Sequence, residues 1–152
     1  MDWFTVEAID KHSWVISEYK HWEETHCYLL EGQDSALLID SGLGICDLSP
    51  VIRNLTDKPV TVIATHIHWD HIGNHGSFDR MGVHPLEAAW LECFPVPLTQ
   101  IRRDLCKEPC DFPKDFNPAA YMPFRGKPDF MINDGDVIDL ARFGELGNQG
   151  VL

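Results

Sequence analysis

The sequence predicts a mixed α+β fold in one domain, with its chemistry concentrated where a buried strand ends. The chain has 152 residues, which suffices for one domain with its own core. Short apolar or alternating segments separated by turn residues indicate strands, and apolar residues at helical spacing indicate short helices. Metal-binding side chains directly follow the β-branched run at residues 60–64. This run predicts a buried strand, and the loop after it is where we expect function.

The first half of the chain contains a clear hairpin signal. Two apolar segments flank Gly32-Gln33-Asp34, a sequence typical of a β-turn. After the second segment, Asp40-Ser41-Gly42-Leu43-Gly44 ends the strand, and its two glycines allow a tight turn. The expected elements of this half are strands at 13–19, 25–30, 35–40 and 60–64, and a helix over 48–55.

The second half is less regular. Seven prolines interrupt residues 94–128, which we interpret as an irregular insertion with one or two helical turns after Leu98. Its aromatic residues either pack on the core or form a lid over a pocket. We expect the domain to cover residues 1–140, with a weakly structured tail at 141–152. The other expected elements are short helices at 76–80 and 85–93, a short strand at 82–84, and a hairpin of strands 130–132 and 137–140 around a turn at 133–136.

The charge of the chain excludes several classes of partner. The net charge is -12, which repels nucleic acid and anionic membranes. The first residues do not resemble a secretory signal, and no apolar run approaches the ~20 residues that span a bilayer. Five cysteines cannot all pair, so we expect a reducing, cytoplasmic setting. The partner we expect is a small-molecule substrate. Cys106 and Cys110 have metal-like spacing without a second pair, which favours plain thiols.

Four metal-binding side chains lie within six residues of the loop that follows the strand at 60–64. In an extended segment alternate residues share a face, so His66, His68 and Asp70 can converge while the residues between them pack inward. The change of alternation after Asp70 lets His71 reach a neighbouring position. Imidazole and carboxylate ligands suit one or two zinc ions, with iron or manganese as alternatives.

The motif His66-x-His68-x-Asp70-His71, preceded by Thr65, resembles the signature of the metallo-β-lactamase superfamily. The resemblance extends over roughly residues 13–93 and 129–140. It implies an αββα sandwich, of which we expect this chain to hold the first half. It also implies hydrolysis of an ester, thioester, lactone or amide by a metal-bound hydroxide.

The resemblance also implies a role for each motif residue. His66 and His68 would bind a first metal, and Asp70 and His71 a second. Asp70 would also hold the attacking water and is therefore the expected catalytic residue. Asp40 resembles the residue that braces the metal loop by hydrogen bonds, although it could equally cap a turn.

The chain departs from the family pattern after Leu140. No histidine follows His84, so the later ligands of the family are missing, and we expect the hydrolase to be incomplete as this chain. One alternative is an inactive fragment that acts as a binding or assembly module, with a homo-oligomer covering its exposed sheet face. Another is a mononuclear iron oxygenase acting on persulfides. The remaining histidines are expected to be peripheral: His12 and His21 on the surface, His75 as a cap or facing solvent, His84 structural, and His26 at a strand start from which it could face the site.

Overall fold

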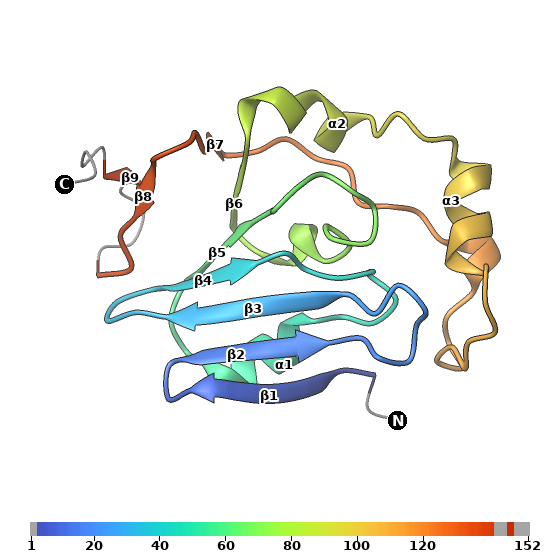
Figure 1. Cartoon of the computed structure of the whole chain (residues 1–152), viewed down its shortest axis with the longest axis horizontal. Coiled ribbons are helices and arrows are strands. Elements are labelled where there is room, and N and C mark those ends of the chain that lie inside the picture. The colour runs from blue at the N-terminus through green and yellow to red at the C-terminus, as the bar shows by residue number, and fades with distance from the viewer. Residues whose placement is uncertain (1–2, 142–145, 148–152) are drawn as a thin grey trace.

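The computed structural model describes residues 3–141 and 146–147. Its centre is one seven-stranded sheet in which the strands follow the order of the chain (Figure 1). The first four strands are antiparallel, and the last four, beginning with the fourth, are parallel. The strands are β1 Thr5–Asp10, β2 Ser13–Ser17, β3 His26–Glu31, β4 Ala36–Ile39, β5 Val60–Ile63, β6 Arg80–Val83 and β7 Phe130–Met131.

Short helices connect the strands, so the predicted α+β class is confirmed. Helix α1 follows β4 and carries Pro50 in its first turn, where a missing N–H is tolerated. The helices are α1 Ser49–Leu55, α2 Ala88–Glu92 and α3 Leu98–Leu105, with single 3-10 turns at η1 His75–Ser77, η2 Pro85–Glu87 and η3 Pro118–Ala120.

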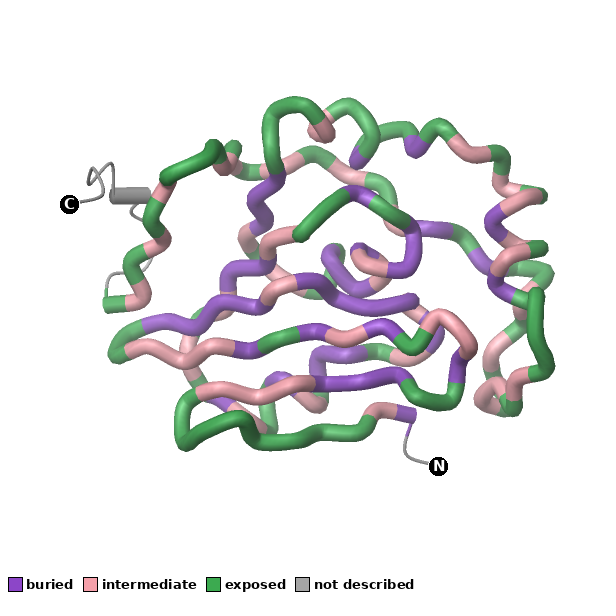
Figure 2. Tube along the Cα trace, in the orientation of Figure 1, coloured by how far each residue is buried: buried purple, intermediate pink, exposed green. Residues whose placement is uncertain are grey.

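The two faces of the sheet differ in burial. Leu29, Leu38, Val62 and Met81 are register partners across four neighbouring strands, and all four are buried. This row defines the core face of the sheet, and Figure 2 shows buried positions recurring along the central strands. On the other face Tyr28, whose register partner is Ile39 on β4, is 39% exposed. Leu37, two residues before Ile39 on the same face, is buried, so this face is partly covered, and further cover by a second copy of the chain stays a prediction.

The parallel order of β4 and β5 brings their two following loops together. Carboxyl ends of parallel strands meet at one edge of a sheet, which is where ligands bind in such arrangements. Gly73 donates its N–H to the Gly42 carbonyl at 2.7 Å, and Ser41 donates to the His71 carbonyl at 2.8 Å. A Cβ added to Gly73 would lie 2.2 Å from the Gly44 backbone nitrogen, so only glycine permits this approach.

Two sequence-based expectations about the elements need correction. The expected hairpin of residues 130–132 and 137–140 is wrong, because β7 pairs in parallel with β6 and β8 Val137–Ile138 pairs with β9 Leu146–Gly147. The turn itself is present, since Asp136 donates its N–H to the Asn133 carbonyl at 3.1 Å. The helix expected at 76–80 is only the η1 turn, because β6 already begins at Arg80.

The other expected elements of the first half are present, and α2 with η2 occupies the helix expected at 85–93. Strand β1 was not predicted. The tail expected at 141–152 lies almost wholly outside the described residues, and the domain limit at residue 140 stays a prediction. Within the described part of the chain, no helix combines the length and the apolar character needed to cross a membrane.

Candidate metal-binding site

The four motif side chains lie together in the loop between β5 and η1. The ring centroids of His66 and His71 are 4.3 Å apart, and those of His66 and His68 are 5.5 Å apart. His68 Nδ1 lies 3.0 Å from Asp70 Oδ1, and His71 Nε2 lies 3.4 Å from Asp70 Oδ2. Asp70 is therefore the centre of the cluster, with one carboxylate oxygen facing each of two histidines.

The residues between the ligands anchor the loop to the core. Ile67 and Trp69 are 1% and 3% exposed, whereas His66 and His68 are exposed to solvent. This is the alternation expected of an extended segment. The Ile67 N–H also donates to Glu87 Oε1 at 3.0 Å, which ties the loop to the end of η2. The buried side chains fix the loop so that its polar side chains face outward together.

Asp40 braces this loop from the end of β4. Its Oδ1 accepts the Thr65 N–H at 2.7 Å, and its Oδ2 accepts the Thr65 hydroxyl at 2.8 Å and His71 Nδ1 at 2.9 Å. Asp40 has a φ of 61°, a left-handed conformation that Asp and Asn tolerate better than most residues. The bracing hydrogen bonds expected of Asp40 are thus present.

The bond between Asp40 and His71 changes the pKa of both groups. Burial alone would raise the pKa of Asp40, but the hydrogen bonds from His71 and Thr65 lower it below its usual value. Burial alone would lower the pKa of His71, but the bond to Asp40 and the charges of Asp70, Asp40 and Glu23 raise it above its usual value. The pair is thus a carboxylate that orients an imidazole.

The donors suit a metal ion in kind but do not complete a site in number. Imidazole nitrogen with carboxylate oxygen is a ligand set of zinc and related ions. His71 donates Nδ1–H to Asp40, which leaves its Nε2 to face Asp70. Within residues 3–141, however, no group of three or more His, Cys, Asp or Glu side chains is arranged to hold one ion. A catalytic zinc site normally uses three protein ligands and a water.

His75 neither faces solvent nor caps the η1 turn with its side chain, so both expected roles were wrong. The side chain is 0% exposed, and its Nδ1 lies 2.6 Å from the Ser41 hydroxyl. Ser41 Oγ accepts the Asn74 N–H at 3.0 Å, which leaves the hydroxyl hydrogen to donate to His75. Burial lowers the pKa of His75 to about 4. This neutral pair lies directly beneath the loop that carries the motif and joins it to the turn after β4.

His21 is also buried, against the expectation of a surface position. Its Nε2 donates to the Leu105 carbonyl at 2.9 Å, and its Nδ1 accepts the Glu23 N–H at 3.2 Å. The loop between β2 and β3 is thereby fixed to the end of α3. The Trp22 Nε1–H donates to the Asp104 carbonyl at 2.8 Å in the same way. No local sequence signal reveals the contacts with α3, because the two carbonyl partners lie more than 80 residues away.

The fixed β2–β3 loop brings an unpredicted carboxylate toward the site. Glu23 interacts electrostatically with Asp70, His68 and His71, although no motif includes it. Burial, followed by the charge of Asp70, raises the pKa of Glu23 above its usual value. A second carboxylate, Glu18, is 1% exposed and accepts hydrogen bonds from the Trp3 indole, the Thr25 hydroxyl and the Leu43 N–H.

The other histidines lie outside the cluster. His26 contacts the Ser17 hydroxyl at 2.8 Å and packs edge-on against Tyr19, so it is not directed at the motif. His84 caps η2 by accepting the Leu86 N–H at 3.2 Å, which is the structural role expected of it. His12 is exposed, also as expected.

The aromatic residues of the 94–128 segment pack behind the motif. The Tyr121 hydroxyl donates to the Leu43 carbonyl at 2.7 Å, and its ring packs edge-on against Trp69 at 6.0 Å. Phe116 packs against Tyr121, and Phe112 against Phe116. Of the two interpretations left open by the sequence, packing against the core describes these residues. They support the motif loop from its buried side.

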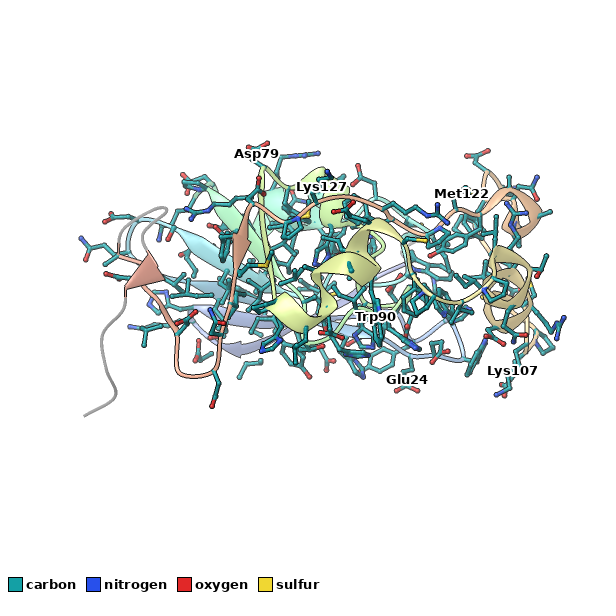
Figure 3. The ribbon with its side chains drawn as sticks, turned by 90° about the horizontal axis from the view of Figure 1, so that it is seen from above. Glu24, Asp79, Trp90, Lys107, Met122 and Lys127 are labelled. Atoms are coloured by element: carbon teal, nitrogen blue, oxygen red, sulfur yellow. The ribbon has the colours of Figure 1, made fainter. Side chains whose placement is uncertain are left out.

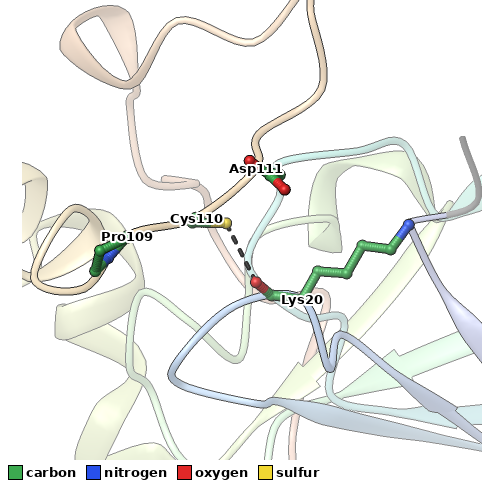
Figure 4. A pocket seen from close by; sticks show the side chains of 4 residues that line it. All are labelled: Lys20, Pro109, Cys110 and Asp111. Atoms are coloured by element: carbon green, nitrogen blue, oxygen red, sulfur yellow. Dashed lines mark hydrogen bonds between the residues drawn. The ribbon is translucent and has the colours of Figure 1, made fainter.

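Two cavities lie away from the motif. One of about 450 Å³ is lined by Lys20, Pro109, Cys110 and Asp111, with the Cys110 thiol donating to the Lys20 carbonyl at 3.3 Å (Figure 4). The other, of about 400 Å³, lies beside α1. None of the motif residues lines either cavity. The five cysteines lie in the described part of the chain and are free thiols there.

The sequence matches the model of a known protein family over the region that contains this site. A family model described as the metallo-beta-lactamase superfamily matches residues 22–146, which is most of the chain. The chain belongs to the metallo-beta-lactamase superfamily. The resemblance that the motif suggested is therefore confirmed over residues 22–146, which include the ligand loop and strands β3 to β8.

Curated relatives within the superfamily are named acyl-coenzyme A thioesterase MBLAC2. The one from Bos taurus is 26% identical over 158 residues, covering 93% of this chain and 56% of the relative. The one from Homo sapiens is 24% identical over the same shares. The chain thus spans about half the length of the curated relatives it matches.

Solved structures of the superfamily share the fold. A metallo-beta-lactamase from Pontibacter korlensis aligns with a TM-score of 0.56 and 18% identity, covering 91% of this chain and 57% of that one. A motif variant of the metallo-beta-lactamase from Cronobacter sakazakii aligns with a TM-score of 0.54 and 20% identity, covering 88% and 50%. At this identity the likeness establishes the fold alone.

Proposed function

We propose that this chain carries the metal-binding loop of a hydrolase that cleaves thioesters. The observation that carries the proposal is the convergence of His66, His68 and His71 on the Asp70 carboxylate, braced by Asp40. Family membership supports hydrolysis as the reaction class. The relatives named as acyl-coenzyme A thioesterases support a thioester over the ester, lactone or amide alternatives.

Each motif residue has a proposed task. His66 and His68 would hold one zinc ion, and Asp70 with His71 would hold or approach a second. The metal, when bound, would supply a hydroxide at neutral pH and polarise the thioester carbonyl. Asp40 keeps the proton of His71 on Nδ1, so the lone pair of Nε2 remains on the side of the cluster.

Besides binding metal, Asp70 is proposed to orient the attacking water. Its carboxylate lies between two histidines, where it can accept a hydrogen bond from an incoming water and orient it toward the substrate. The side chain is 5% exposed, so the packing of the loop restricts its movement. An oriented carboxylate at this point is the feature that hydrolysis needs and that a purely structural turn does not.

Competing functions differ in measurable ways. An iron oxygenase acting on persulfides would contain iron in place of zinc. A non-catalytic assembly module would show no turnover and would associate through the apolar sheet face. Elemental analysis of the chain purified without chelators separates zinc from iron or manganese. The five free thiols support the reducing, cytoplasmic setting that we propose for the protein.

The test is turnover of a substrate panel. The 152-residue chain is assayed with butyryl-coenzyme A, a lactone, a simple ester and a phosphodiester. Because the described residues offer fewer ligands than a catalytic zinc site uses, we expect slow turnover, with thiol release from the thioester as the fastest reaction. The variant Asp70→Asn should lose at least about 100-fold of that rate. His12→Gln, which changes an exposed residue, is the matched control and should retain full activity. Equal rates in Asp70→Asn and His12→Gln would overturn the proposal.

A further inference from the structure

An aromatic column leads away from the candidate site along α2. The Phe94 ring packs edge-on against His68, with centroids 5.3 Å apart and an interplanar angle of 88°. Trp90 packs edge-on against Phe94 at 6.3 Å and 84°. Phe94 is 8% exposed, whereas Trp90 is 43% exposed. The column therefore connects a proposed metal ligand to an open apolar surface.

Leu86 extends this surface away from the site. Leu86 lies in η2 and Trp90 in α2, which follows η2 directly, whereas Phe94 lies beyond the end of α2, after the extended residue Cys93. Leu86 and Trp90 are four residues apart, a spacing at which side chains of a helical segment are neighbours. Leu86 is 84% exposed, which is the highest exposure among the large apolar side chains of the described residues. Trp90 projects from α2 in Figure 3.

This apolar surface is not needed for the core. Leu91 is 0% exposed and supplies the core-facing side of α2. A helix in a soluble domain normally presents polar residues on its other side. Trp90 and Leu86 instead place apolar surface in water beside a polar cluster. Apolar surface rimmed by polar residues is typical of ligand-binding grooves.

We propose that Phe94, Trp90 and Leu86 form the acyl-binding surface of this site. The apolar chain of a thioester would lie along these three residues, and its carbonyl would sit at the His68 end. The inference rests on the proposed thioester hydrolysis for the position of the carbonyl. It adds the substrate class, an uncharged apolar acyl group, and names the residues that select it.

The apolar side chains favour an uncharged acyl chain. An acyl group that ends in a second carboxylate would place that charge against Phe94 and Trp90, where it would lose hydration. Among acyl groups of similar length, the site should therefore prefer butyryl to succinyl.

The kinetic test uses a series of acyl chains. Butyryl-, octanoyl- and lauroyl-coenzyme A are compared in the unmodified chain and in Trp90→Ala. We expect Trp90→Ala to raise the KM for lauroyl about tenfold and the KM for butyryl by less than about twofold, with kcat unchanged. Trp90→Phe should restore most of the loss. Ile9→Ala removes a similarly exposed apolar side chain from β1 and should change neither KM.

A binding measurement separates this inference from the proposed reaction. The S-dodecyl thioether of coenzyme A cannot be hydrolysed, and its affinity is measured by calorimetry. One outcome is that no thioester is hydrolysed, the thioether binds, and Trp90→Ala weakens its affinity about tenfold. This outcome overturns the proposed thioester hydrolysis and supports the acyl-binding surface. A second outcome is that thioesters are hydrolysed and KM depends on acyl-chain length in the same way in Trp90→Ala and in the unmodified chain. This outcome overturns the acyl-binding surface and supports thioester hydrolysis. Absence of both turnover and binding overturns both.

Discussion

Asp40 accepts the Nδ1–H of His71 at 2.9 Å, which fixes the ring so that Nε2 lies 3.4 Å from the Asp70 carboxylate. The two aspartates belong to different loops at the carboxyl ends of adjacent parallel strands. Asp40 orients the His71 imidazole, and Asp70 faces the Nε2 atom of the same ring. The relationship makes the site depend on the contact between the two loops as well as on the motif.

Replacing Asp40 tests this dependence. Asp40→Ala leaves the Thr65 N–H and His71 Nδ1 without their acceptor and places alanine at a φ of 61°. We expect a loss of about 3 kcal/mol in the free energy of unfolding. Asp40→Asn keeps an acceptor and tolerates the backbone, so its loss should be about half as large. Urea unfolding measures both, and equal stability of the alanine variant and the unmodified chain would contradict the bracing role.

The acidic surroundings of His71 predict its titration. The charge of Glu23 contributes to raising the pKa of His71, and removing that charge destabilises the imidazolium. The pKa of His71, followed by NMR in the metal-free chain, should therefore lie above its usual value and fall in Glu23→Gln. Glu24→Gln changes the neighbouring exposed carboxylate and is the matched control. A larger fall in the control would show that Glu23 does not face the site.

His75 predicts a loss of stability in mild acid. Its pKa is about 4 in the folded chain and 6.5 for an unperturbed imidazole, so the unfolded chain binds the proton first as pH falls. The contribution of neutral His75 to the free energy of unfolding is fully present above pH 6.5. It is lost progressively as the pH falls to 4, and the total loss is about 3 kcal/mol. The free energy of unfolding of His75→Gln, measured by urea at several pH values, should fall less steeply across this window. Parallel curves for the two proteins would contradict the assignment.

The approach of the two loops at Gly73 predicts a strong steric effect. An added Cβ would lie 2.2 Å from the Gly44 nitrogen and 2.3 Å from the Leu43 carbonyl carbon, and backbone cannot move aside as a flexible side chain can. Gly73→Ala should therefore lower the free energy of unfolding by about 3 kcal/mol. Gly135→Ala is a useful contrast, because Gly135 has a φ of 84° but nothing within 4 Å of its added Cβ. That variant should lose only about 1 kcal/mol from backbone strain, and a reversal of this order would rule out the close approach.

Local sequence patterns were sufficient for the parts of the fold that depend on neighbouring residues. The alternation at Ile67 and Trp69 predicted which side chains of the motif would face outward, and the burial of both residues agrees. The hairpin of β3 and β4 followed from its turn residues. The turn at 133–136 was also correct, but a turn does not determine which strand pairs with which. Strand β7 joined β6 instead, far away in the sequence.

The features that local sequence patterns did not predict depend on partners that lie far away in the sequence. His21 is buried because the Leu105 carbonyl, 84 positions away, accepts its proton. Glu23 approaches the site because that same contact fixes its loop. His75 is buried because the turn after β4 supplies Ser41. Strand β1 has only a weak signal, because the alternation of Val6 and Ala8 with polar residues stops at Ile9, and all six residues of the strand are exposed.

The metal dependence of thioester hydrolysis tests the central claim most directly. The 152-residue chain is stripped with a chelator, and thiol release from octanoyl-coenzyme A is measured before and after zinc is restored, beside Asp70→Asn. We predict negligible turnover without metal, recovery with zinc, and no recovery in Asp70→Asn. Turnover that is equal with and without metal, or equal in Asp70→Asn, would contradict the assignment of His66, His68, Asp70 and His71 as a metal-dependent hydrolytic site.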